Sequence, residues 1–292
     1  MKKKRKIPVS KIFVYFILAG IGFVYLYPVL YMIVNSFLSA GDLTDPSVTW
    51  IPTELCFDNF STAFKTLDFF KSFGMSMLMS LIPAVLQTAV TAVVAYGLAR
   101  FHIPFKKVIL VLILITFLLP TQVMLVPRYV LFDTYHLTDT IWAQFLPALF
   151  GQGLNSAIFI FVYYSYFVSY PVVLDEAAEI DGAGKWKIFL KVSLPMAKGA
   201  IILSMLFSFV FYWNETYLSN TLWGGKIQTL PLKLQSFTLQ YEALYGKEAA
   251  GSISESVSLA GTLLSILPLL VMYLIFQRQF VESIESTGIT GE

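Results

Sequence analysis

The sequence predicts an all-α integral membrane protein with six transmembrane helices. Of the 292 residues, 57% are apolar and only 13% are charged, and the mean hydropathy is +0.72. A soluble domain carries about 25% charged residues, so this composition could not supply a water-soluble surface. The apolar segments are continuous rather than alternating, which excludes the pattern of a membrane-spanning β-barrel.

Six windows contain no Asp, Glu, Lys or Arg and together cover just over half of the chain: 12–41, 72–99, 108–127, 140–174, 199–214 and 256–277. Crossing about 30 Å of hydrocarbon takes roughly 20 helical residues, and five of the windows reach that length. We predict spans at 12–34, 73–99, 108–127, 141–168, 199–218 and 256–277, within a single transmembrane domain that covers residues 1–292.

The later spans differ in what interrupts them. The fifth window is too short by itself, so we extend the fifth span past Glu215 to Tyr217 and Leu218. Glu215 then lies at the end of that span, where an interfacial position is the favoured interpretation. Prolines within or at the ends of spans can kink a membrane helix whose freed backbone groups are satisfied by neighbours. These prolines are Pro83, Pro120, Pro147 and Pro268.

The positions of Lys and Arg predict the orientation of the chain. Fourteen of the twenty lie in the N-terminus, in loops 100–107 and 175–198 and in the C-terminal tail, which the six spans place on one side. The other six lie on the opposite side. Basic segments stay cytoplasmic, so both termini are predicted to be cytoplasmic.

Several functional classes are disfavoured by what the sequence lacks. The charge-free windows hold no carboxylate or amine that could carry a coupling proton or sodium ion, which disfavours a secondary transporter. Cys56 is the only cysteine, and neither His102 nor His136 gives it metal-ligand or catalytic spacing. Nucleic-acid binding would need a basic face with residues that read the bases, and the sequence shows none. There is also no G-x-x-x-x-G-K-[ST] phosphate-binding loop.

The stretch from Val173 to Pro195 has the pattern of two short helices broken at a glycine. Val173, Ala177 and Ile180 are spaced to share one helix face, and two acids in the first turn complement the helix dipole. Gly182 can take a positive φ and turn the chain, and Pro195 is predicted to end the second helix. From this pattern alone, an interfacial helix lying on lipid headgroups is an equal alternative.

The same stretch resembles the EAA loop of binding-protein-dependent ABC importer permeases, which has the pattern E-A-A-x3-G-x9-I-x-L-P. The matching residues are Glu176-Ala177-Ala178, Gly182 and Leu194-Pro195. Val192 stands at the isoleucine, and Asp181-Gly182-Ala183 is similar to the carbohydrate branch. The similarity extends over nearly the whole chain. The ending, with Phe280-Val281-Glu282, Gly288 and Gly291, is similar to that of the smaller, six-span, maltose-type permease subunit.

The resemblance implies a function for this connection, the coupling loop (residues 171–198), between spans four and five. The loop would dock on a separate ATPase subunit. When that subunit moves, the docked loop would pass the movement to the spans before and after it. The implied docking residues are Glu176, Ala177, Ala178, Asp181, Gly182 and Ala183, with Leu194 and Pro195 anchoring the loop to the next span.

The resemblance also implies the partners and the location. They are a second permease subunit that forms a heterodimer, two ATP-binding subunits, an extracytoplasmic solute-binding protein and a carbohydrate substrate. The chain would lie in the lipid bilayer of a bacterial plasma membrane as a multi-pass protein. It would be no enzyme and bind no cofactor, because the partner subunits bind the ATP.

The implied function is that of a permease subunit of an ATP-driven importer, which moves a sugar or oligosaccharide by alternating access. The alternatives are an ATP-independent carrier or channel and an importer permease for a non-sugar solute. Sugars bind by stacking on aromatic faces and by planar amide hydrogen bonds. Tyr212, Trp213 and Asn214 of span five are therefore candidates for the substrate pathway. Ordinary packing and interfacial aromatic belts are the competing explanation for these side chains.

Overall fold

The computed structural model describes residues 9–248 and 254–288, and within those ranges every regular element is helical. This confirms the predicted all-α class. The chain divides into two compact units: unit 1 is Met1–Phe69 with Ser236–Leu267, and unit 2 is Phe70–Gln235 with Pro268–Glu292. The lysines of the N-terminus before residue 9 lie outside the described residues, so the orientation stays a prediction.

Unit 1 contains one long apolar helix and several short ones. The buried side-chain amide of Asn59 joins α3 (Asp58–Thr66) to the end of the long helix, because it donates to the carbonyls of Ser36 and Leu38 at 3.0 and 2.9 Å. These bonds satisfy carbonyls at the end of the long helix, where no helical partner remains. The elements are α1 (Val9–Ser36), α2 (Ala40–Thr44), α3 (Asp58–Thr66), α15 (Phe237–Tyr245) and the first part of α17 (Glu255–Gly288).

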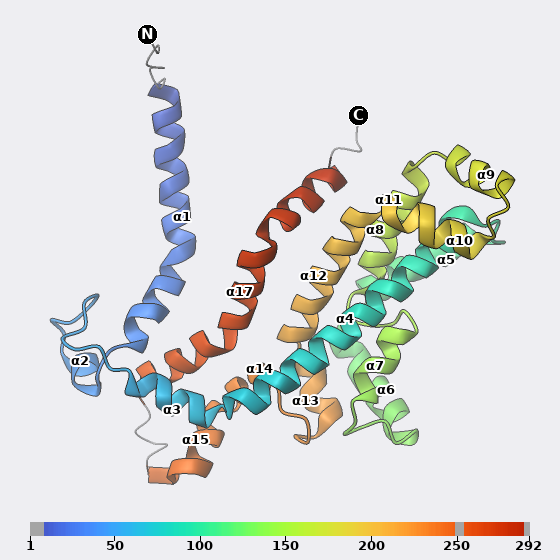
Figure 1. The fold of residues 1–292 in the computed structure, drawn as a ribbon. Helices are drawn as coiled ribbons and strands as arrows, with labels where there is room; N and C mark the ends of the chain where they lie inside the picture. Colours follow the sequence, from blue (N-terminus) through green and yellow to red (C-terminus); the bar gives the residue numbers. More distant parts are fainter. Residues whose placement is uncertain (1–8, 249–253, 289–292) are drawn as a thin grey trace. The chain divides into compact units, whose positions relative to one another are not determined.

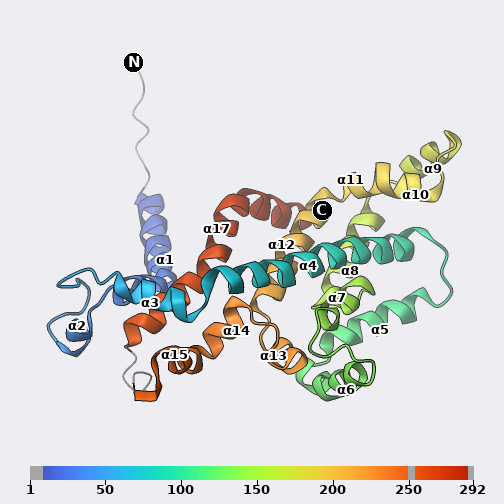
Figure 2. The ribbon, with the colours of Figure 1, turned by 60° about the horizontal axis from the view of Figure 1, so that its bottom comes forward.

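Unit 2 holds the candidate site. Its longer helices are α4 (Phe69–Arg100), α5 (Lys106–Leu118), α6 (Thr121–Thr134), α8 (Ser156–Ser169) and α12 (Lys198–Asn214). Its shorter helices are α7 (Trp142–Leu149), α9 (Val173–Ile180), α10 (Lys185–Ile188), α11 (Leu194–Met196), α13 (Tyr217–Trp223) and α14 (Leu230–Gln235). Helices α9, α10 and α11 lie at one end of α8 and α12, while α6 and α13 lie toward the other end (Figures 1 and 2).

Small residues on α4 allow aromatic side chains to pack against it at the end near the coupling loop. The buried cluster there joins α4, α8, the turn after α10 and the start of α12. Close approach of a helix to large rings needs such small side chains on one partner. The buried members are Ala92, Ala95, Tyr96, Leu98, Ile160, Tyr163, Phe167, Tyr170, Phe189, Ala197 and Ala200.

Three helices in the described ranges are long and apolar enough to cross a membrane: Phe13–Ser36, Phe69–Arg100 and Glu255–Gln279. They correspond to the first, second and sixth predicted spans. The number rises to six if each of three sharply bent helix pairs counts as one span. Only the first of these bends, between Leu118 and Thr121, falls inside a predicted span, the third. The other two bends lie between Ser169 and Val173 and between Met196 and Lys198, just outside the predicted fourth and fifth spans.

The third predicted span, 108–127, breaks between α5 and α6, which meet at 99°. Pro120 disfavours helical conformation at the residue before it, and Leu119 is accordingly extended, with φ −73° and ψ 122°. The fourth predicted span, 141–168, breaks between Leu149 and Ser156. Gly151 and Asn155 both take positive φ there, +71° and +54°, and this left-handed conformation stops a right-handed helix.

The predicted extension of the fifth span is wrong, because α12 ends at Asn214. Glu215 is extended, with ψ 110°, and its carboxylate turns to the next helix. It accepts hydrogen bonds from the backbone amides of Leu218 and Ser219 at 2.9 and 2.8 Å, and from the Ser219 hydroxyl at 2.8 Å. An acidic group at this position satisfies free amides at the start of α13 and complements the helix dipole.

We expect the Glu215→Ala substitution to lower the free energy of unfolding by about 1–2 kcal/mol, the usual effect of losing a helix cap. The thermal unfolding midpoint of the purified protein in detergent measures this loss. Glu54→Ala removes an exposed carboxylate from the loop between α2 and α3 and serves as the control. Equal midpoints for the two variants would contradict the capping role.

Candidate functional site

The first candidate site is the coupling loop, where the structure confirms two short helical segments separated at Gly182. α9 ends in a Schellman motif: the amide of Gly182 donates to the carbonyl of Glu179, and the amide of Ala183 donates to the carbonyl of Ala178, both at 2.9 Å. Gly182 has φ +79°, which costs a glycine little. The glycine therefore fixes the angle at which α9 joins the rest of the loop.

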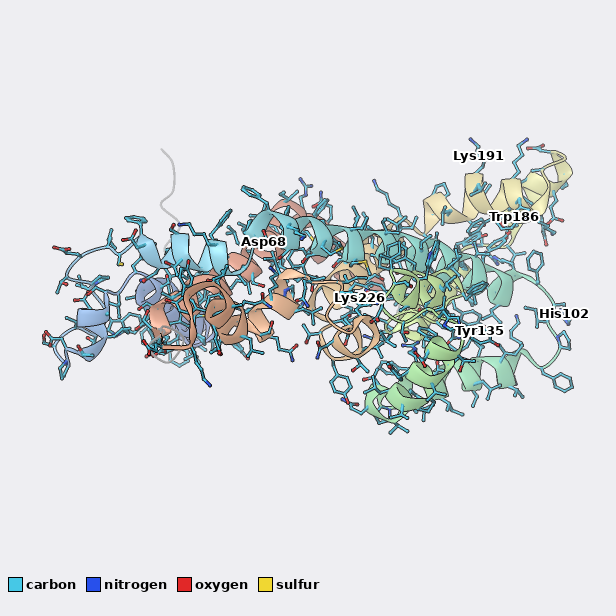
Figure 3. The ribbon with its side chains drawn as sticks, turned by 90° about the horizontal axis from the view of Figure 1, so that it is seen from below. Asp68, His102, Tyr135, Trp186, Lys191 and Lys226 are labelled. Atoms are coloured by element: carbon cyan, nitrogen blue, oxygen red, sulfur yellow. The ribbon has the colours of Figure 1, made fainter. Side chains whose placement is uncertain are left out.

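The implied docking residues form an accessible surface on this loop. Four of the six are exposed and two, Ala178 and Ala183, are half-buried. The apolar side chains of Val173, Ile180 and Trp186 are also exposed, Ile180 by 88% and Trp186 by 65%. Trp186 lies on this segment at the edge of unit 2 (Figure 3). Large exposed apolar groups next to small ones are typical of a surface that contacts a membrane or another protein.

Pro195 does not end the second helix, contrary to the sequence prediction. The chain passes through a π-helical turn (Phe189–Ser193) into α11, and Pro195 lies inside α11. A proline has no amide to donate within a helix, and a wider π turn is a common way to accommodate such a gap. The helical path instead bends by 79° between Met196 and Lys198. Leu194 is half-buried and Pro195 is exposed.

Four side chains from separate elements fasten the coupling loop to the end of α4, and we call them the anchor cluster: Arg100, Tyr170, Asp175 and Ser193. Arg100 Nε lies 3.1 Å from Asp175 Oδ2, with the two side chains only 9% and 10% exposed. The Arg100 Nη2 group donates to the Tyr170 carbonyl at 2.9 Å, and the guanidinium lies 3.8 Å from the centre of the Tyr170 ring. A planar guanidinium can make such stacking and pairing contacts together.

The hydroxyl groups of the anchor cluster form a directed chain of hydrogen bonds. The Tyr170 hydroxyl lies 2.7 and 2.9 Å from the Asp175 carboxylate oxygens and 2.6 Å from Ser193 Oγ. An ionised carboxylate only accepts, so Tyr170 donates to Asp175 and Ser193 donates to Tyr170. Burial raises the pKa of the Tyr170 hydroxyl, and its bond to Asp175 raises it further. The phenol therefore stays protonated and remains a donor at neutral pH.

Sequence reasoning missed this cluster. It placed Asp175 among the acids that complement a helix dipole and Arg100 among the basic residues that set the orientation. The structure adds that Asp175 is the buried residue of α9. One available signal was an arginine at the end of an apolar helix, whose charge needs a partner when it is buried. Nothing in the local pattern indicated which carboxylate would supply it.

A second polar cluster lies at the break between α7 and α8. Gln87 on α4 donates to the Leu154 carbonyl at 2.7 Å and to Ser208 Oγ at 3.1 Å. Its side-chain oxygen accepts from the Tyr212 hydroxyl at 2.7 Å, and that hydroxyl accepts from the Leu154 amide at 3.2 Å. Both backbone groups of Leu154 are thus satisfied by side chains from other helices, as a broken helix in an apolar environment requires.

Gly153 allows these side chains to approach the break. A Cβ atom on Gly153 would lie 2.1 Å from Gln87 Oε1 and 2.2 Å from the Tyr212 hydroxyl, well inside contact distance. Arg128 on α6 also binds the break, donating to the Gln152 carbonyl at 3.2 Å. We call Gln87, Tyr212 and the backbone of 152–154 the break cluster.

The three candidate pathway residues have different surroundings. Tyr212 belongs to the break cluster and lines a small cavity of about 20 Å³ together with Arg128 and Trp223. That volume suits a water-sized group and is too small for a sugar ring. Trp213 is buried against Phe73 and Phe209. Asn214 is exposed, and its side-chain amide donates to the Val210 carbonyl. Tyr212 is thus the candidate whose surroundings are polar.

The sequence of this chain is similar to those of known transport proteins. The model of a family described as binding-protein-dependent transport system inner membrane component matches residues 90–284, which include the whole coupling loop. The chain is 27% identical over 282 residues to the arabinooligosaccharides transport system permease protein AraQ of Halalkalibacterium halodurans, covering 94% of each chain. It is 26% identical to the probable starch degradation products transport system permease protein AmyC of Thermoanaerobacterium thermosulfurigenes, covering 96% of this chain and 97% of the relative.

A similar fold occurs in a solved structure of a bacterial ABC transporter involved in the import of the acidic polysaccharide alginate. The two chains superpose with a TM-score of 0.76 at 24% sequence identity, over 94% of this chain and 99% of the other. The fold of a known transporter chain is therefore shared along nearly the full length.

Proposed function

The chain belongs to the family of binding-protein-dependent transport system inner membrane components, and from that premise we propose that it is a permease subunit of an ATP-driven importer for a sugar or oligosaccharide. As a member of this family it is an integral plasma-membrane protein and a transport subunit rather than an enzyme.

The observation that carries the proposal is the geometry of the coupling loop. α9 is a short helix with an exposed surface of small and apolar residues, joined to the loop by a Schellman glycine. The loop leads directly from α8 and into α12. A rigid helix that docks on a moving partner transmits displacement to both helices, which is what alternating access by rigid-body motion requires.

In this proposal the motor is a separate ATPase, and this sequence itself contains no phosphate-binding loop for ATP. Two such ATPase subunits would bind two docked loops, one on this chain and one on a second permease subunit in a heterodimer. Glu176, Ala177, Ala178, Asp181, Gly182 and Ala183 form the docking surface in this proposal, with Leu194 and Pro195 joining it to α12. The coupling loop and both termini then face the cytoplasm of a bacterium.

The substrate class is supported by the relatives, which are described as transporting arabinooligosaccharides and starch degradation products. An extracytoplasmic solute-binding protein would deliver the carbohydrate. A panel of sugars tested for a shift in the thermal midpoint of the neighbouring solute-binding protein identifies the ligand. Stabilisation by a non-sugar solute alone would replace the carbohydrate assignment, and uptake that continues after ATP depletion would indicate a carrier or channel.

We expect Ala178→Glu to abolish co-purification of the ATPase subunits with the tagged permease. Ala178 is half-buried beside the turn at Gly182, and a bulky charge there prevents close approach of a partner surface. The matched control is His102→Glu, which places the same charge at an exposed position in the α4–α5 loop (Figure 3). Retention of the ATPase by Ala178→Glu, at the level seen for His102→Glu, would reject the docking surface.

A further inference from the structure

A third helix contacts the coupling loop although it is not adjacent to it in the chain. α8 and α12 continue directly into the loop, whereas α4 meets it through the anchor cluster and through apolar packing of Tyr96 against Phe189. Arg100 is the last residue of α4, and its partners are Asp175 in the first turn of α9 and Tyr170, the residue directly after α8. The loop is therefore attached at three points rather than two.

The attachment has the chemistry of a rigid joint. Arg100 and Asp175 are nearly excluded from water, and Asp175 also accepts a hydrogen bond from the Tyr170 hydroxyl. A buried charge pair that loses its geometry leaves two poorly solvated charges, so the arrangement resists separation. The exposed pair between Glu179 and Lys185 also joins α9 to α10, but exposed pairs contribute little rigidity.

α4 carries the contact onward to the break cluster. From Arg100 to Gln87 the helix contains no proline, and these residues lie about 20 Å apart along its axis at 1.5 Å per residue. Gln87 holds both the Leu154 carbonyl and the Tyr212 hydroxyl. One uninterrupted helical segment thus connects the coupling loop to the polar contacts that support the broken helix.

We propose that Arg100 and Asp175 are positioning residues that make α4 move with the coupling loop, so that displacement of the loop by the ATPase reaches the break cluster through α4. This inference rests on the proposed function and adds a third route to the two helices that flank the loop. It assigns a role to Arg100, Tyr170, Asp175 and Ser193, which all lie outside the docking surface.

Spin labels can test this joint in the complete transporter, purified with its partner subunits and reconstituted in lipid. The Cys56→Ser background removes the chain's only cysteine. New cysteines then carry the labels at two exposed positions, His102 just beyond α4 and Lys191 in the coupling loop (Figure 3). The distance between them is measured without nucleotide and with ATP and vanadate. We expect it to change by less than about 2 Å, the scale of small helix adjustments.

Breaking the ion pair should uncouple the two labels. We expect Arg100→Gln to broaden the distance distribution and to shift its centre between the two nucleotide states by more than twice the wild-type change. Arg100→Lys keeps the charge but loses the planar guanidinium. Its change in label distance should therefore lie between those of the wild type and Arg100→Gln. Glu179→Gln removes the exposed pair within the loop and is the matched control, with the wild-type distances expected.

The outcomes separate this inference from the proposed function. A wild-type complex without ATPase subunits or ATP hydrolysis contradicts the proposed function. A wild-type complex that hydrolyses ATP while the two labels move apart contradicts the joint, and so does Arg100→Gln with unchanged narrow distances. If Arg100→Gln does not assemble, Arg100→Lys is compared with the wild type. A larger change in label distance between the two nucleotide states in Arg100→Lys supports the joint, and an equal change contradicts it.

Discussion

Replacing Gly182 by aspartate is expected to reduce ATP-driven uptake at least about tenfold while the protein still inserts and folds. The backbone at Gly182 has φ +79°, a conformation that aspartate tolerates better than most residues. No atom lies within 4 Å of the position that a Cβ would take, so the new side chain fits. Its carboxylate, however, projects beside Asp181 in the proposed docking surface and adds a like charge where a partner must approach closely.

The measurement compares uptake of the ligand that stabilises the solute-binding protein with ATP hydrolysis in the same proteoliposomes. We expect hydrolysis to continue and uptake per ATP to fall. Gly182→Asn has the same shape without the charge and separates the backbone effect from the electrostatic one. Gly184→Ala, at a negative φ of −70° with open space around it, should behave like the wild type. Normal uptake by Gly182→Asp would remove Gly182 from the docking surface.

The turn at Gly182 could be predicted because its determinants are local. A Schellman motif needs a glycine after a short amphipathic helix, and Val173, Ala177 and Ile180 already marked that helix. The long apolar helices α1, α4 and α17 were predictable for a similar reason, since a continuous apolar window long enough to span has few alternatives. The interpretation of Gly182 as the turn that aims α9 therefore follows from a few neighbouring residues.

The breaks in the middle spans depend on distant residues and could not be predicted in the same way. Pro120 and Pro147 both indicated a possible kink, yet the fourth span breaks after Leu149, where Gly151 and Asn155 take left-handed conformations. A break in an apolar segment is stable only if its free backbone groups find partners. For Leu154 those partners are on α4 and α12, far away in the sequence. The anchor cluster could not be predicted from local sequence either, because its two charged residues, Arg100 and Asp175, come from separate helices.

The Gly153→Ala substitution tests how far the break depends on this close packing. A Cβ at Gly153 would meet two buried polar atoms at 2.1 and 2.2 Å. Gln87 Oε1 and the Tyr212 hydroxyl are hydrogen-bonded to each other at 2.7 Å, so neither can withdraw without losing a partner. Overpacking together with an unsatisfied buried polar group should lower the free energy of unfolding by roughly 2–5 kcal/mol. The thermal midpoint in detergent should fall accordingly.

Gly74→Ala provides the matched comparison, because Gly74 lies inside α4 with no atom within 4 Å of the position that a methyl group would take. Alanine in an open helical position is neutral or stabilising by up to about 1 kcal/mol. The Gly153→Ala, Gln87→Ala double variant distinguishes the cause, since truncating Gln87 removes one of the two clashing atoms. If the double variant is no less stable than Gln87→Ala alone, the clash with Gln87 accounts for the loss. A Gly153→Ala protein as stable as Gly74→Ala would show that the break does not need glycine, and that Gln87 and Tyr212 do not hold it in place.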